Sequence, residues 1–201
     1  MARYVLAILA AAVLCTAVVA QEATPAHKGG DQKITDRVSS FDSASKRYRP
    51  VKCGKNLCLY RIKALLVVDT YHRNQPDPAT FATTVAVYTG RVLEIGTNAT
   101  TGTFEVSGIA TTQPAGPTDT LNIIETHVFE FGPNNDDALT VTGNSQVSPA
   151  TLSITDSDMA VTGGTGQFLG AYGSFTDRSG VLTSNTVSVA DITIYVPNNK
   201  L

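Results

Sequence analysis

The sequence has few of the residues that build metal centres or nucleophilic active sites. It contains 3 histidines and 3 cysteines among 201 residues. His27, His72 and His127 show no spacing typical of metal ligands, so we expect neither a metal ion nor a cofactor. No arrangement of Ser, His and Asp with a nucleophile elbow or oxyanion signal is visible, which argues against acyl transfer.

Long apolar runs are equally scarce. Beyond residue 20 no stretch of about 18 uncharged apolar residues occurs, so we expect no transmembrane segment. Residues 1–20 carry Arg3 near the start, an apolar stretch from Tyr4 to Val19, and the small residue Ala20 at the end. This pattern is typical of a secretory signal peptide, and the run is short for a membrane-spanning helix. We therefore predict a secreted, extracellular protein.

Two further features fit secretion. Cys15 lies in the predicted signal peptide, so the mature chain keeps Cys53 and Cys58, an even number that predicts a disulfide in an oxidising compartment. A loop this short contributes about 2 kcal/mol, enough to fix a local turn. Zinc is the alternative for this pair, but two further ligands are lacking. Asn98 begins the sequon Asn-Ala-Thr and is a predicted glycosylation site.

The charge is unevenly distributed although the net charge is only −2. Between positions 27 and 63 the sequence contains ten Lys or Arg residues but only three acidic residues. Such a segment could contact a polyanion or a membrane surface, but its few apolar residues favour a solvated arm. Nucleic acid is not an expected partner. We divide the chain into a signal peptide (1–20), a basic, partly disordered leader (21–58) and one domain (59–201).

The domain is rich in Thr, Val, Ile and Tyr, interrupted by Gly, Pro, Asn and Asp clusters, which is typical of an antiparallel β protein. No convincing helix appears. Closure into a barrel is favoured over a sandwich because it removes exposed strand edges. The eight expected strands are 59–70, 83–95, 102–112, 121–131, 138–143, 157–162, 167–176 and 186–196.

Alternation along 121–131 defines two faces. Glu125, His127 and Phe129 share one face with Leu121, while the other face is also largely apolar. Two apolar faces are expected if one lines a lumen and the other meets a second subunit. By the same alternation, Asp69 and Tyr71 should share a face.

A glycine-rich segment, Val161-Thr-Gly-Gly-Thr-Gly-Gln-Phe168, separates two expected strands. No helix-forming stretch and no P-loop lysine follow it, so it is not a phosphate-binding loop. The segment resembles the V-x-G-G-[ST]-G-x-F block shared by dirigent proteins and allene oxide cyclases, and the resemblance extends over residues 59–196. It implies an eight-stranded antiparallel barrel with an apolar lumen, assembled as a homodimer or homotrimer.

Secretion favours the dirigent side of this resemblance, and with it the apoplast or cell wall. The letters Gly170-Ala-Tyr172-Gly are closer to the cyclase G-V-Y-G, whereas dirigent proteins usually carry A-R-G there. Dirigent proteins often have an acid where this chain has Gln167, and the cyclases have an asparagine where it has Tyr71.

Asp69, near the end of the first strand, matches an acid found there in both families. An acid at the mouth of an apolar barrel should have its pKa raised by desolvation, toward the range useful for proton exchange. We predict Asp69, Tyr71 and Tyr172 as catalytic residues, the two tyrosines as hydrogen-bond donors. The predicted substrate-binding residues are Glu125, His127, Phe129, Gln167 and Phe168. Glu125 and His127 could equally be two ordinary solvent-exposed residues on one face of a strand.

Three functions remain open. The first is a dirigent-like protein that binds phenoxy radicals or related phenylpropanoids and directs their stereoselective coupling. An external oxidase would supply the radicals, since the chain has no expected redox centre. The second is a cyclase-like isomerase acting on a fatty-acid epoxide. The third is a non-catalytic binding or defence barrel, so whether the chain is an enzyme is left open by the sequence.

Overall fold

The computed structural model describes residues 37–75, 84–111, 119–148, 154–178 and 187–198. The predicted signal peptide and Cys15 lie outside these residues. No described helix is both long and apolar enough to cross a membrane.

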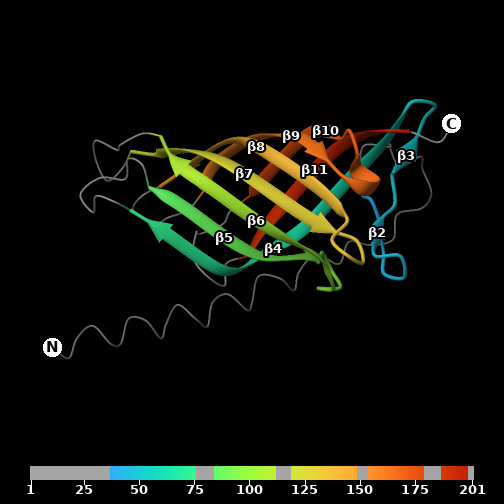
Figure 1. Cartoon of the computed structure of the whole chain (residues 1–201), viewed down its shortest axis with the longest axis horizontal. Helices are drawn as coiled ribbons and strands as arrows, with labels where there is room; N and C mark the ends of the chain where they lie inside the picture. The colour runs from blue at the N-terminus through green and yellow to red at the C-terminus, as the bar shows by residue number, and fades with distance from the viewer. Residues whose placement is uncertain (1–36, 76–83, 112–118, 149–153, 179–186, 199–201) are drawn as a thin grey trace, which may run out of the picture. The chain divides into compact units, whose positions relative to one another are not determined.

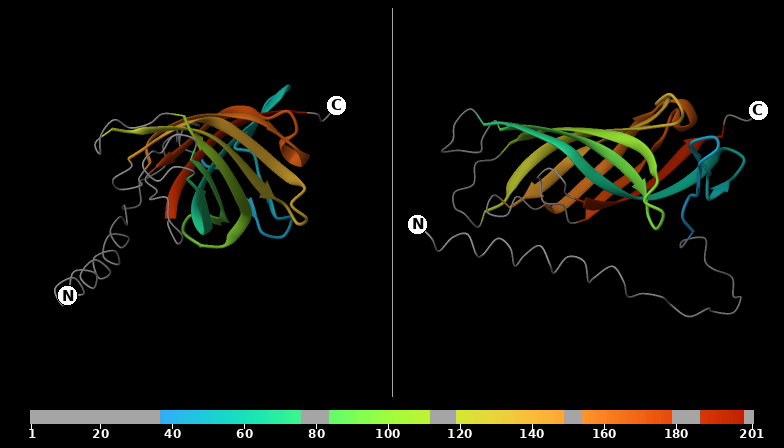
Figure 2. Two further views of the ribbon diagram at one scale, coloured as in Figure 1. Left: turned by 60° about the vertical axis from the view of Figure 1, so that its left-hand side comes forward. Right: turned by 90° about the horizontal axis from the view of Figure 1, so that it is seen from below.

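Eight long strands form a closed antiparallel barrel in which each strand pairs with its neighbours in the sequence. The last strand pairs with the first over eleven residues, which closes the wall. Figures 1 and 2 show the strands side by side and inclined to the long axis of the barrel. The strands are β4 (Leu57–Asn74), β5 (Val85–Glu94), β6 (Thr100–Ala110), β7 (Leu121–Phe131), β8 (Asp137–Val147), β9 (Ile154–Gly164), β10 (Tyr172–Arg178) and β11 (Val187–Pro197).

The predicted all-β, eight-stranded antiparallel barrel is therefore confirmed. One expected strand, 167–176, is wrong in its first half. Gly166–Phe168 forms a 3-10 helix, η2, and β10 begins only at Tyr172. Gly166 and Gly170 adopt φ values of 56° and 74°, the left-handed region that glycine tolerates, so the chain turns here before the strand starts.

The interior is lined largely by aromatic and branched side chains. Alternate residues of every long strand point inward, as the pleat of a strand requires. The largest enclosed side chains are Phe129, Phe131, Phe168 and Phe175, each at most 1% exposed. Their burial supplies much of the apolar surface that holds the barrel together.

One end of the barrel is closed by aromatic rings. Tyr48 from the short strand β2 (Arg47–Tyr48) meets Phe131 edge to face at 5.3 Å between ring centroids. Phe168 of η2 packs against Phe131 and Tyr60 at 5.8 and 5.5 Å. We call this the closed end; β2 and η2 both lie there in Figure 1.

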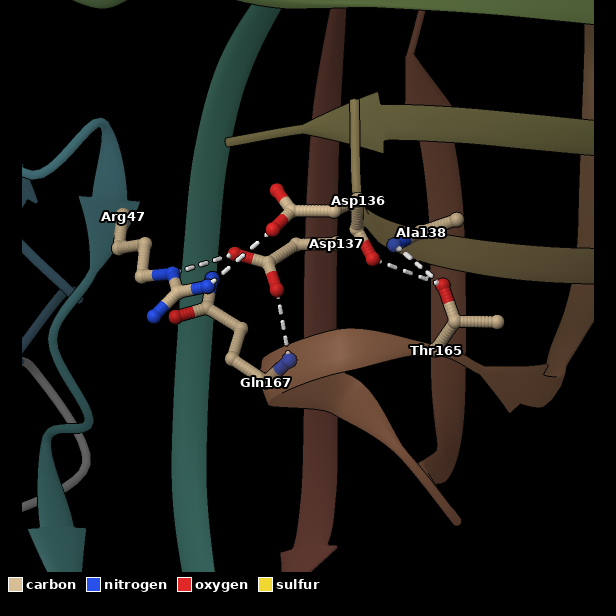
Figure 3. Close-up of polar contacts among 6 residues, drawn as sticks. All are labelled: Arg47, Asp136, Asp137, Ala138, Thr165 and Gln167. Atoms are coloured by element: carbon tan, nitrogen blue, oxygen red, sulfur yellow. Dashed lines mark hydrogen bonds and ion pairs between the residues drawn. The ribbon is translucent and has the colours of Figure 1, made fainter. Parts of the chain in front are cut away.

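A buried carboxylate fastens the closed end (Figure 3). The Asp137 side chain is fully enclosed, and its Oδ2 accepts a hydrogen bond from Arg47 Nε at 2.9 Å. Its Oδ1 accepts one from the backbone N–H of Gln167 at 2.7 Å. Nearby, the Thr165 hydroxyl donates to the Asp136 carbonyl and accepts from the Ala138 N–H. Asp137, at the start of β8, is thus hydrogen-bonded to both β2 and η2.

The second half of the predicted leader is consequently part of the fold. β1 (Phe41–Asp42) pairs with β2, and β3 (Lys52–Cys53) pairs with β4. The disulfide Cys53–Cys58 is present between β3 and β4, as predicted. The sequence analysis placed residues 37–58 outside the barrel domain because of their charges, and ion pairs such as Arg47 with Asp137 satisfy part of that charge.

We predict that Phe168→Ala destabilises the protein by about 3–5 kcal/mol, because the change leaves a cavity between two aromatic rings. The matched control is the adjacent Leu169→Ala, which removes a side chain that is 60% exposed. That variant should stay within about 0.5 kcal/mol of the parent protein. Urea unfolding of the three proteins provides the measurement, and equal effects of the two variants would contradict the closed-end packing.

Candidate functional site

A β-bulge in β4 decides which side chains reach the interior. Val68 pairs with Gly90 and Thr70 with Thr89, so Asp69 is left without a partner on β5. The extra residue reverses the alternation. Tyr71 consequently points inward and packs against the core, whereas Asp69 points outward. The sequence placed both residues on one face because regular alternation was assumed.

Asp69 is an exposed ion-pair partner on the outer wall. Its carboxylate accepts from Arg91 Nε at 2.9 and 3.1 Å and from Nη2 at 2.8 Å, and its side chain is 40% exposed. The hydrogen bonds from Arg91 lower the pKa of Asp69. The prediction of a desolvated acid with a raised pKa is therefore wrong. This pair borders a shallow outer groove of about 440 Å³, which also touches Thr103 and Glu130.

Tyr172 also lies on the outer wall. Its ring stacks on Tyr195 with centroids 5.5 Å apart, and it is 50% exposed. Because β10 begins at this residue and Phe175 points inward, the alternation turns Tyr172 outward. The prediction that Tyr172 donates a hydrogen bond inside the barrel is therefore not supported by its position.

The predicted binding residues fall into two groups. Gln167 and Phe168 belong to the closed end, where Phe168 is fully buried. Glu125, His127 and Phe129 all line the interior on β7, with exposures of 2%, 1% and 0%. The alternation along β7 was thus predicted correctly. The alternative of a solvent-exposed rim is wrong, because the closed wall shields both polar side chains.

Glu125 and His127 form a buried pair inside the barrel. His127 Nε2 lies 3.1 Å from Glu125 Oε2, and the Ser145 hydroxyl donates to the same oxygen at 2.8 Å. Ser145 comes from the neighbouring strand β8 and is fully buried. Charged groups are rarely buried unless they are paired, so this arrangement is a distinctive feature of the interior.

The contact with Glu125 bears on the tautomer of His127. A carboxylate without a proton can only accept hydrogen bonds, so beside Glu125 in that form the ring carries its proton on Nε2. The other ring nitrogen, Nδ1, then presents a lone pair. Nδ1 is buried and makes no hydrogen bond within the protein.

Tyr88 completes the cluster from β5. Its hydroxyl is buried and also makes no hydrogen bond. Its ring packs edge to face against the His127 ring, with the ring centroids 6.5 Å apart. Burial raises the pKa of Tyr88 well above 10, and the nearby charges of Glu125 and Asp177 raise it further. Its phenol group therefore keeps its proton and can donate a hydrogen bond. The sequence analysis did not include Tyr88 among the predicted site residues.

Aromatic rings surround these polar groups. The ring centroids of Phe175 and Phe129 lie 5.1 and 6.1 Å from that of His127. The centroids of the Tyr71 and Tyr88 rings are 6.4 Å apart. We call Tyr71, Tyr88, Glu125, His127 and Ser145 the interior cluster. It offers one hydrogen-bond donor and one acceptor within an apolar, aromatic setting.

The remaining predicted sites are simpler. Within the described ranges, no group of three or more His, Cys, Asp or Glu side chains could hold a metal ion. Asn98 sits in an exposed turn with a φ of 57°, and its side chain is accessible, as glycosylation would require. Its modification stays a prediction.

Comparison with known proteins gives a match in fold but not in sequence. No protein family model and no curated protein matches the chain. Solved structures do match. A pyocyanin demethylase is 16% identical with a TM-score of 0.52, covering 67% of this chain and 98% of its own. A pterocarpan synthase dirigent protein is 13% identical with a TM-score of 0.53, covering 75% and 91%.

A third match is the Diels–Alderase AbmU from Streptomyces koyangensis, 11% identical with a TM-score of 0.50, covering 73% of this chain and 72% of its own. At such identities the likeness establishes the barrel fold alone. The dirigent-like fold predicted from the sequence is therefore shown.

We predict that the Asp69 carboxyl titrates below its ordinary pKa of 3.8, and that Arg91→Gln returns it toward that value. Because the pKa is lowered in the folded state, the stabilisation from the pair is complete above the unfolded-state pKa. It is lost as the pH falls through the folded-state pKa. A carbon-detected NMR titration measures both pKa values. An Asp69 pKa above 3.8 in the parent protein would contradict the ion pair and favour a desolvated carboxyl group instead.

Proposed function

We propose that this protein binds a phenolic or related aromatic molecule inside the barrel and directs the stereochemistry of its coupling, as a dirigent-like protein. One observation carries the proposal. The Tyr88 hydroxyl and His127 Nδ1 are both buried, both lack a hydrogen-bond partner, and belong to rings that touch.

Unpaired polar atoms of this kind are unusual in a folded interior. Leaving a buried donor or acceptor unsatisfied costs about 1–3 kcal/mol, so most are paired with protein or water. A ligand that carries a hydroxyl or carbonyl oxygen would satisfy these atoms. Its ring would meet the aromatic walls formed by Tyr71, Phe129 and Phe175. Apolar walls with a few convergent polar groups are typical of small-molecule sites.

The fold supports the same class of function. The matching structures are named as a synthase of the dirigent type, a demethylase and a Diels–Alderase, so the barrel serves small-molecule chemistry in each. The energetic demand on a stereo-directing protein is modest, because a tenfold preference for one coupling face needs only about 1.4 kcal/mol. The radicals would come from an external oxidase.

Location and assembly extend the proposal. An extracellular site, in the apoplast or cell wall, is supported by the disulfide and by the accessible sequon at Asn98. A homodimer or homotrimer is supported by Ile109 and Ile124, which pair across β6 and β7 on the outer wall and are each 52% exposed.

An isomerase of the cyclase type is the second candidate. The observation that favours it is the buried Glu125–His127 pair, since acid–base groups held away from water suit proton transfer during ring closure. A binding barrel without catalysis would need the same interior but no stereochemical effect on its ligand.

The coupling assay decides between these functions. Purified protein is incubated with coniferyl alcohol and a one-electron oxidant, and the enantiomeric excess of the dimers is measured. We expect an excess of one enantiomer that grows with protein concentration. Racemic dimers at excess protein would contradict the dirigent assignment, and chiral cyclopentenone formed from an allene oxide would instead support the isomerase.

We expect Tyr88→Phe to weaken binding of coniferyl alcohol by about three- to tenfold, because it deletes one hydrogen bond worth about 0.5–1.5 kcal/mol. Tyr172→Phe is the matched control, since that hydroxyl lies on the outer wall. Isothermal titration calorimetry measures both affinities. Similar losses in the two variants would place the ligand outside the barrel.

A further inference from the structure

We infer that His127 accepts a proton from a hydroxyl group of the bound molecule, so that the barrel selects weakly acidic hydroxyarenes and holds them as their anions. This inference rests on the proposed binding site and assigns its chemistry. The acceptor atom is Nδ1, which is buried and unpaired, and the ring stands on the inner face of β7.

Glu125 is the residue that positions the His127 ring for proton acceptance. It contacts His127 Nε2 at 3.1 Å and is itself held by the Ser145 hydroxyl at 2.8 Å. A carboxylate on one nitrogen of an imidazole fixes the ring orientation and its tautomer, and it stabilises the imidazolium form once a proton arrives on the other nitrogen. The side chains are 2%, 1% and 0% exposed for Glu125, His127 and Ser145, so water does not compete for these bonds.

Tyr88 supplies the complementary donor. Its phenol stays protonated because burial raises its pKa, and it can donate to an oxygen that gains negative charge. An acceptor at His127 and a donor at Tyr88 together match a group that both gives and receives a hydrogen bond. A hydroxyl group does so, whereas an ether or a hydrocarbon does not.

The proton transfer balances without a further reactant. The O–H bond of the ligand breaks, its electron pair stays on the oxygen, and an N–H bond forms at Nδ1 of His127. No electron leaves the site. The resulting imidazolium lies between the Glu125 carboxylate and the new oxyanion, so opposite charges alternate.

Other ionisable groups near the cluster determine whether a bound anion is stable there. Glu125 and Asp177 both raise the pKa of Tyr88, which places their charges near its hydroxyl, and Tyr71 adds a smaller effect. These acids repel an anion. The oxyanion is therefore stable only when the imidazolium is formed with it, which makes His127 the deciding residue.

The test uses 4-nitrophenol, whose anion absorbs at longer wavelength than its neutral form, and 4-nitroanisole, which has the same ring but no hydroxyl. Spectra are recorded with the whole protein at a pH where free 4-nitrophenol is mostly protonated. We expect the bound probe to show the band of the anion, and 4-nitroanisole to bind about tenfold more weakly.

Variants separate proton transfer from packing. In His127→Gln the bound probe should remain neutral, and Glu125→Gln should reduce the anionic fraction because the ring loses its carboxylate. Thr126→Ala, on the outward side of the same strand, is the matched control and should leave the spectrum unchanged. Circular dichroism checks that each variant folds. If His127→Gln does not fold, the spectrum of the parent protein together with that of Glu125→Gln still tests the inference.

The two probes distinguish the failures. If both bind equally and 4-nitrophenol stays neutral, the inference is overturned while the proposed binding site stands. The inference is likewise overturned if His127→Gln still binds the anion. If neither probe nor coniferyl alcohol binds, the proposed function fails together with it.

Discussion

Closure of the barrel by β4 and β11 is the constraint on which the other features depend. Eleven residue pairs join these two strands, so each of the eight described strands of the wall pairs with a neighbour on both sides. Because the wall is continuous, Glu125 and His127 are 2% and 1% exposed. In an open sheet the same side chains would be hydrated, and their mutual hydrogen bond would contribute little. The chemistry proposed for the interior therefore follows from a backbone contact between residues far apart in the sequence.

The two ends of the barrel serve different purposes. The closed end is a packing device, in which aromatic rings fill the lumen and the buried Asp137 carboxylate ties β2 and η2 to the wall. In Figure 3 both oxygens of the Asp137 carboxylate and the Thr165 hydroxyl have partners within the protein, whereas the buried Gln167 Nε2 has none. The interior cluster leaves the Tyr88 hydroxyl and His127 Nδ1 unsatisfied. The proposed ligand site rests on this unsatisfied donor and acceptor, which belong to neighbouring aromatic rings, more than on the likeness of fold.

The sequence predicted the strands well because each has a period of two and is bounded by turn residues. It also placed Glu125 and His127 on one face correctly. It missed the orientation of Asp69, because a bulge is a pairing irregularity between β4 and β5 and leaves no trace in the alternation of one strand. It missed Tyr88 and Ser145 as partners, because they reach His127 and Glu125 from strands whose register cannot be read from composition. Tyr172 was misplaced since the start of β10 depended on a glycine turn.

The barrel holds an imidazole, His127, whose Nε2 contacts Glu125 and whose buried Nδ1 has no partner within the protein. Long-range proton–nitrogen NMR correlation of the His127 ring in the ligand-free protein tests this arrangement most directly. We predict a proton on Nε2 and an unprotonated Nδ1, the tautomer in which His127 donates to the Glu125 carboxylate. A proton on Nδ1 with Nε2 as the acceptor would contradict it, because the nitrogen free to meet the ligand would then be a donor.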